Sequence, residues 1–176
     1  EIYYCIASIM RFAPWIHKIY IVTDEQDPKV DGFIKKHFPE NNIPIEIIDH
    51  KVIFEGYEDC LPTFNSLSIT SMLWRIPGLS EHYILFNDDV MLLRDTSVED
   101  YFVDGRIVLY GEKWIPTFVA EMTIALQTVF RRLQGKKTLL SFKKFMLNAA
   151  YAVHQRRILR LCHTPHAFLK GIPLQR

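Results

Sequence analysis

The stretch that decides the fold is YILFNDDVML, residues 83–92, which places Asp88 and Asp89 at the end of an apolar run. Uninterrupted β-branched and aromatic residues predict a buried strand. Two ionised carboxylates are costly inside a fold, so we expect them where the strand emerges, beside a cation or cationic side chains. The pair therefore predicts a metal–diphosphate site. The alternative is that Asn87 and Asp88 start a turn and Asp89 caps the next element.

Two earlier segments have the same character and also end in polar residues. Residues 18–24 (KIYIVTD) end in Asp24, and residues 43–50 (IPIEIIDH) end in Asp49 and His50. Strands that alternate with short helices are typical of a βαβ sheet with covered faces. We therefore expect an α/β, Rossmann-like (GT-A-like), mostly parallel sheet covered by helices, followed by a helical and basic C-terminal part. Ligands bind at the carboxyl ends of such strands, so all these acids should share one rim. The helices are expected at residues 1–12, 30–38 and 63–75.

The charge is distributed unevenly along the 176 residues. All 20 acidic residues lie at or before Glu121, whereas 11 of the 21 basic residues follow it. Either the basic part packs against the acidic part, or it faces an anionic partner such as a nucleotide sugar, a polyanionic product or lipid head groups. Residues 120–133 and 141–161 predict two basic-faced helices. We expect three parts: an α/β core truncated at its N-terminus, a helical insertion or subdomain, and a C-terminal active-site loop region, at residues 1–119, 120–162 and 163–176.

Several function classes lose support. The chain contains no P-loop, GxGxxG, HExxH or GxSxG motif, which disfavours P-loop kinases, dinucleotide oxidoreductases and serine esterases. Its three cysteines are widely spaced, so neither a zinc site nor a disulfide framework is expected. No run of 18 apolar residues predicts a transmembrane helix. The basic segments lack interleaved exposed aromatic residues, so we expect no nucleic-acid binding.

Four strings together resemble one known family. They are RFAPWIHKIYIVTDEQDP (11–28), LPTFNS (61–66), RIPGLSEHYILFNDDVML (75–92) and HTPHAFLK (163–170). They resemble the second and third conserved regions of the Stealth family, which includes bacterial capsular polysaccharide phosphotransferases and the catalytic subunit of the lysosomal-enzyme N-acetylglucosamine-1-phosphotransferase. The first conserved region of the family has no counterpart here, so we expect that the chain is truncated at Glu1.

The resemblance implies a reaction. The reaction is transfer of a sugar-1-phosphate from a UDP-sugar donor to a hydroxyl of a polysaccharide acceptor, with release of UMP, in capsular or cell-surface polysaccharide synthesis. Asp88 and Asp89 would be catalytic and would hold Mg²⁺ or Mn²⁺, ions that prefer carboxylate oxygens. His163 would act as a base or donate to phosphoryl oxygens. The absence of disulfide signals and of a membrane span in the sequence favours the cytoplasmic side of the inner membrane, and the basic part suggests peripheral membrane association. The oligomeric state is not indicated.

Five further residues are candidates for substrate binding. Asn87 precedes the acidic pair. Asn65 and Ser66 begin a helix, where they could bind phosphate or simply cap the helix. Arg75 could clamp a phosphate or pair with Glu81, and Asp24 could approach the uridine or the metal or cap a loop.

Two departures from the family keep alternatives open. Leu67 and Thr70 stand where family members have a His and a Glu. One alternative function is a metal-dependent nucleotide-sugar glycosyltransferase, which would release UDP. The other is a catalytically inactive remnant that binds sugar nucleotides or polymer.

Overall fold

The computed structural model describes residues 1–135, 157–161 and 164–171. They divide into two compact units, Glu1–Val108 with Thr164–Arg176, and Leu109–His163. The three-part division expected from the sequence remains a prediction.

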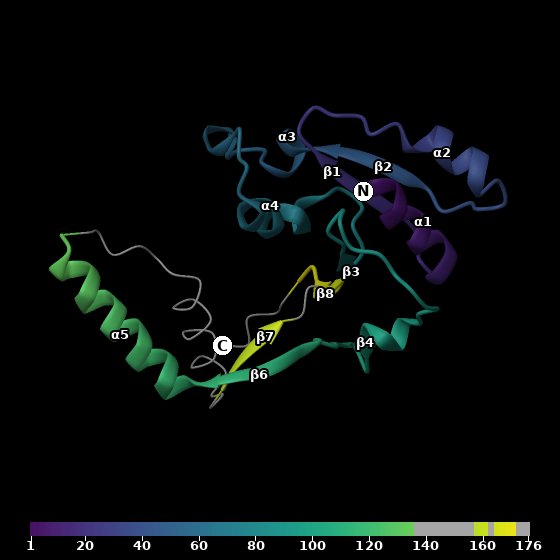
Figure 1. The fold of residues 1–176 in the computed structure, drawn as a ribbon. Coiled ribbons are helices and arrows are strands. Elements are labelled where there is room, and N and C mark those ends of the chain that lie inside the picture. Colours follow the sequence, from purple (N-terminus) through teal and green to yellow (C-terminus); the bar gives the residue numbers. More distant parts are fainter. Residues whose placement is uncertain (136–156, 162–163, 172–176) are drawn as a thin grey trace. The chain divides into compact units, whose positions relative to one another are not determined.

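The first unit opens with alternating helices and strands (Figure 1). These are α1 (Ile2–Phe12), β1 (Ile19–Thr23), α2 (Val30–His37) and β2 (Ile45–Asp49). β1 and β2 pair in parallel, in a register that runs from Ile19 opposite Ile45 to Thr23 opposite Asp49. The predicted strands and helices of this region are therefore confirmed, and the two strands present their carboxyl ends at one edge.

Side chains alternate between the two faces of β1, and each face packs against helices. Ile21 joins a cluster with residues of α1 and α2, namely Ile6, Met10 and Val30. Tyr20 and Val22 pack on the other side, where the buried residues are Ile48, Ile53, Phe54, Leu73 and Ile76. Because both faces of β1 pack against helical segments, this region is α/β with helical cover on both sides, as predicted.

Short elements connect β2 to the next strand. These are α3 (His50–Ile53), the 3₁₀ helix η1 (Glu58–Cys60), α4 (Ser66–Met72) and the 3₁₀ helix η2 (Leu73–Arg75). The last two confirm the helix expected at residues 63–75, although it begins later than expected.

The strand that precedes the acidic pair has an unexpected hydrogen-bonding partner. β3 (His82–Leu85) pairs antiparallel with β8 (His166–Leu169), and the rings of Tyr83 and Phe168 stack with centroids 5.5 Å apart. Among the described residues, β1–β2 is the only parallel pair. One mostly parallel, Rossmann-like sheet is therefore not confirmed. The physical reason is that β3 bonds to a strand from the far end of the chain that runs in the opposite direction.

Three small elements follow β3 in the first unit. The 3₁₀ helix η3 (Val98–Asp100) precedes a short hairpin of β4 (Phe102–Val103) and β5 (Arg106–Ile107). The hairpin turns through Asp104 and Gly105, both at positive φ.

In the second unit, β6 (Gly111–Pro116) pairs antiparallel with β7 (Arg157–Leu161), and α5 (Thr117–Leu133) follows β6. The helix expected at residues 120–133 is confirmed. The helix expected at 141–161 is wrong for its last five residues, which form β7, and residues 136–156 lie outside the described part. None of the helices described is long and apolar enough to cross a membrane. Large apolar side chains of α5 are exposed, namely Phe118, Met122, Leu126, Val129, Phe130 and Leu133.

Candidate functional site

The acidic pair occupies the two central positions of a turn just beyond β3. The backbone N–H of Val90 donates to the carbonyl of Asn87 at 3.1 Å. Asn87, Asp88 and Asp89 are all exposed. The pair thus lies at the surface just after the short strand, where water and ligands can reach both carboxylates.

A buried thiol of α1 lies next to this turn. Cys5 is 5% exposed, and its Sγ donates to the carbonyl of Asn87 at 3.7 Å. Burial, together with the negative charges of Asp88 and Asp89, raises the pKa of the Cys5 thiol to about 11. The negative potential of the pair therefore extends into the surface of α1 that faces the turn.

The donor set of the pair suits one class of ion. Mg²⁺ and Mn²⁺ prefer oxygen ligands, and Mg²⁺ commonly takes one or two carboxylates while water and substrate phosphates complete its coordination. Within residues 1–135, 157–161 and 164–171, no three or more His, Cys, Asp or Glu side chains gather as a metal cage. Asp88 and Asp89 therefore fit an open site that a substrate would complete, and they do not fit a closed structural site.

A second polar group lies at the carboxyl ends of β1 and β2. Asp49 caps α3, because its two carboxylate oxygens accept from the backbone N–H groups of Lys51 and Glu25, each at 2.8 Å. These hydrogen bonds, led by that from Lys51, lower the pKa of the Asp49 carboxyl. The Lys51 ammonium also pairs with the Glu25 carboxylate. Asp49 thus ties the loop after β1 to the helix after β2.

Asp24 and His50 meet at the same edge. His50 is 7% exposed, and its Nδ1 lies 3.9 Å from Oδ1 of Asp24. This Nδ1 is buried and has no hydrogen-bond partner. The convergence expected for the ends of β1 and β2 is therefore confirmed. β3 is not hydrogen-bonded into this sheet, so a rim shared with Asp88 and Asp89 remains a prediction.

The remaining candidates lie on and around α4. Oδ1 of Asn65 accepts from the backbone N–H of Leu67 at 3.0 Å, so Asn65 is the helix cap, and Ser66 is the exposed first residue of the helix. Arg75 does not pair with Glu81 as the sequence suggested. Its Nη2 donates to the carbonyl of Glu55 at 2.6 Å, and the Glu81 carboxylate accepts from the N–H of Gly171 at 2.8 Å.

The Arg75 guanidinium also contacts two exposed aromatic rings. Its central carbon lies 5.3 Å from the ring centroid of Tyr57 and 5.9 Å from that of Trp74. His163, the expected base, lies outside the described residues.

Sequence reasoning missed Ser8, a buried hydroxyl on α1 that binds the segment after the acidic pair. A signal was present, because Ser8 is a polar residue at helical spacing from Cys5 and Phe12 on an apolar face.

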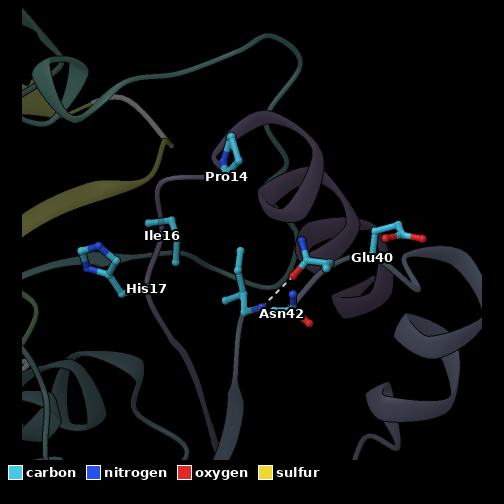
Figure 2. A pocket seen from close by; sticks show the side chains of 7 residues that line it. Pro14, Ile16, His17, Glu40 and Asn42 are labelled. Atoms are coloured by element: carbon cyan, nitrogen blue, oxygen red, sulfur yellow. Dashed lines mark hydrogen bonds between the residues drawn. The ribbon is translucent and has the colours of Figure 1, made fainter.

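A shallow hollow lies at the opposite, amino ends of β1 and β2. Figure 2 shows that Pro14, Ile16 and His17 line it from the connection before β1, and Glu40 and Asn42 from the connection before β2. It contains none of the residues predicted to bind substrate.

The sequence matches one family model over most of its length. Residues 1–110 match Stealth protein CR2, conserved region 2. This range includes Asp24, Asn65, Arg75 and the acidic pair.

Similar proteins are named as phosphotransferases of polysaccharide synthesis. An exopolysaccharide phosphotransferase of Streptomyces coelicolor is 36% identical over 174 residues, which are 98% of this chain and 16% of that protein. An exopolysaccharide phosphotransferase of Lactiplantibacillus plantarum is 42% identical over 59% of this chain and 28% of that protein. A capsular polysaccharide phosphotransferase of Neisseria meningitidis is 44% identical over 58% of this chain and 26% of that protein.

The chain spans less than a third of each of these relatives. The family match nevertheless covers the segments from α1 through β5, including the turn that carries the two carboxylates. The chain belongs to the Stealth family.

Proposed function

We propose that the protein containing this chain transfers a sugar-1-phosphate from a UDP-sugar to a hydroxyl of an acceptor sugar, releasing UMP, in the synthesis of a capsular or extracellular polysaccharide. The observation that carries the proposal is the family match over residues 1–110, which includes an exposed carboxylate pair. The names of the relatives support a phosphotransferase.

The chemistry is substitution at phosphorus. The acceptor oxygen forms a bond to the phosphorus that carries the sugar, the bond from this phosphorus to the UMP oxygen breaks, and the anomeric bond stays intact. Positioning and charge neutralisation therefore dominate catalysis. Asp88 and Asp89 would hold Mg²⁺ or Mn²⁺, which when bound neutralises charge on the diphosphate. The acceptor proton would pass to one of these carboxylates or to His163.

The experiment is a UMP-release assay on the full-length protein, with and without EDTA. We expect Asp88→Asn and Asp89→Asn each to lower the rate by about 100-fold or more, as the loss of one charge-stabilising group does in other enzymes. Asp95→Asn is the matched control, since Asp95 is an exposed acid in the same segment, and its rate should stay near that of the wild type. UMP formation unchanged in both test variants would rule out the acidic pair as the catalytic site.

The product separates the alternatives. UDP in place of UMP would identify a glycosyltransferase. UDP-sugar binding without turnover would identify an inactive binding protein, which the exposed Leu67 in place of the family His favours.

A further inference from the structure

The segment that carries the acidic pair has no regular structure of its own. Residues 86–97 form neither helix nor strand. A free loop would leave the two carboxylates in many relative orientations, and ordering them would cost conformational entropy whenever a ligand binds. Something outside the segment must therefore hold it.

One face of α1 contacts this segment at successive points. Cys5 Sγ donates to the carbonyl of Asn87 at 3.7 Å, and the backbone N–H of Leu92 donates to Ser8 Oγ at 2.9 Å. Further along, Thr96 donates to the carbonyl of Phe12 through its backbone N–H at 2.8 Å and its hydroxyl at 3.0 Å. Helix residues three and four apart lie on one face, so α1 acts as a continuous support.

Ser8 makes the middle one of these three contacts, and its hydroxyl acts as both a hydrogen-bond donor and an acceptor. Its hydroxyl donates to the carbonyl of Cys5 at 2.7 Å, which leaves a lone pair for the Leu92 amide. Ser8 is 7% exposed and Leu92 8%, and the Leu92 side chain packs against Cys5, Ile9 and Ala13. A buried N–H without an acceptor is destabilising, so the amide of Leu92 depends on this oxygen.

The two carboxylates lie between these anchors. Asn87 is fixed immediately before them, and Leu92 is fixed three residues after Asp89. The turn between Asn87 and Val90 then leaves little freedom for the pair. A preformed pair binds a cation without a further ordering cost.

We propose that Ser8 is a positioning residue for the Asp88–Asp89 pair. Its Oγ holds the backbone at Leu92, and this contact keeps the two carboxylates in one arrangement for a divalent cation. The inference rests on the proposed function for the identity of the ligand, and it adds a residue remote in sequence that sets the affinity.

The test measures Mn²⁺ binding to the full-length protein by the loss of the free-ion EPR signal, with no substrate present. We expect Ser8→Ala to raise the dissociation constant for Mn²⁺ by about 10-fold or more, the size found when groups that orient metal ligands are removed. Ser8→Thr keeps the oxygen acceptor and should restore binding.

Thr96→Val is the matched control. It also removes a hydroxyl that forms a hydrogen bond between the segment and α1. This hydrogen bond lies four residues beyond the contact of Leu92 with Ser8, and so farther from the acidic pair. We expect it to lower the melting temperature as Ser8→Ala does, while leaving Mn²⁺ affinity near that of the wild type. If Ser8→Ala does not fold, Ser8→Cys replaces it, because the thiol leaves no cavity and sulfur is a weaker acceptor.

Asp88→Asn separates the two levels of the proposal. If Mn²⁺ binding is weaker in Asp88→Asn but not in Ser8→Ala, the positioning role of Ser8 is overturned and the metal site is not. Equal weakening by Ser8→Ala and Thr96→Val would also overturn the role of Ser8, because that result indicates general destabilisation. Unchanged binding in Asp88→Asn would overturn the metal site, and the role of Ser8 with it.

Discussion

At the scale of single residues, the Cys5 thiol reports on the charges of the acidic pair. Its pKa is raised from 9.0 to about 11, first by burial and then by Asp88 and Asp89. Only the thiolate reacts rapidly with alkylating reagents, so the pH midpoint of the reaction follows the pKa. Exposed Cys60 lies in a 3₁₀ helix and serves as an internal reference.

We predict that Cys5 resists iodoacetamide up to about pH 10 in EDTA, because the thiol is still protonated there. Removing both charges, in Asp88→Asn with Asp89→Asn, should lower the midpoint, since fewer negative charges oppose the thiolate. Mass spectrometry of the Cys5 peptide across a pH series gives the measurement. Restricted access of the reagent to Cys5 would by itself slow the reaction at every pH without moving the midpoint, and Asp95→Asn should not move it. A wild-type midpoint near 9.0 would contradict the structure.

At the scale of elements, local sequence patterns are enough to predict the position of an element that is defined by its own sequence. The apolar spacing of α1 and the strand-like runs of β1 and β2 predicted their positions to within two residues. The sequence pattern predicts a helix for residues 157–161 (RILRL), although the pattern of a short apolar segment does not decide between helix and strand. Pairing with β6 decided it. The partner of β3 is about 80 positions away in the chain, a contact that local periodicity does not encode.

The candidate site divides in the same way. The turn at Asp88 and the cap at Asn65 depend on neighbouring residues, so the sequence alone included them among its alternatives. The contact between Ser8 and Leu92 and the burial of His50 depend on how distant elements pack. These were out of reach of sequence patterns.

Two glycines provide a paired test of the elements. Gly32 lies in α2 with nothing near its missing Cβ, whereas Gly78 has φ +72° and a Cβ there would lie 3.3 Å from Tyr20 Oη. We predict that Gly32→Ala stabilises the protein by about 0.5–1 kcal/mol, because alanine restricts the unfolded chain and suits a helix. Gly78→Ala should destabilise it by about 1–2 kcal/mol, because left-handed backbone is strained for alanine. Urea denaturation measures both, and changes of the same sign would contradict the geometry.

At the scale of the whole molecule, the chain leaves its first unit after Val108 and returns to it at Thr164. The returning residues form β8, which is the hydrogen-bonding partner of β3. Ala167 of β8 is 1% exposed. Outside the strand ladder, the N–H of Lys170 donates to the Glu81 carbonyl at 2.7 Å, and its ammonium donates to the Leu79 carbonyl at 3.2 Å. In chain order, the segment from Leu109 to His163 therefore interrupts the first unit.

We predict that the first unit folds when residues 109–163 are replaced by a flexible Gly/Ser linker, because β8 is still present to pair with β3. A chain that ends at Val108 loses β8 and three hydrogen bonds of Lys170 and Gly171. At about 1 kcal/mol for each bond, it should be less stable by about 3 kcal/mol or more. Ala167→Asp in the linked chain is a control that keeps the length of the linked chain. It disrupts β8, because it places a charge at a buried position of this strand. It should unfold at nearly the same urea concentration as the shorter chain, followed by circular dichroism. Equal midpoints for the linked chain and the shorter chain would mean that β8 does not stabilise the first unit.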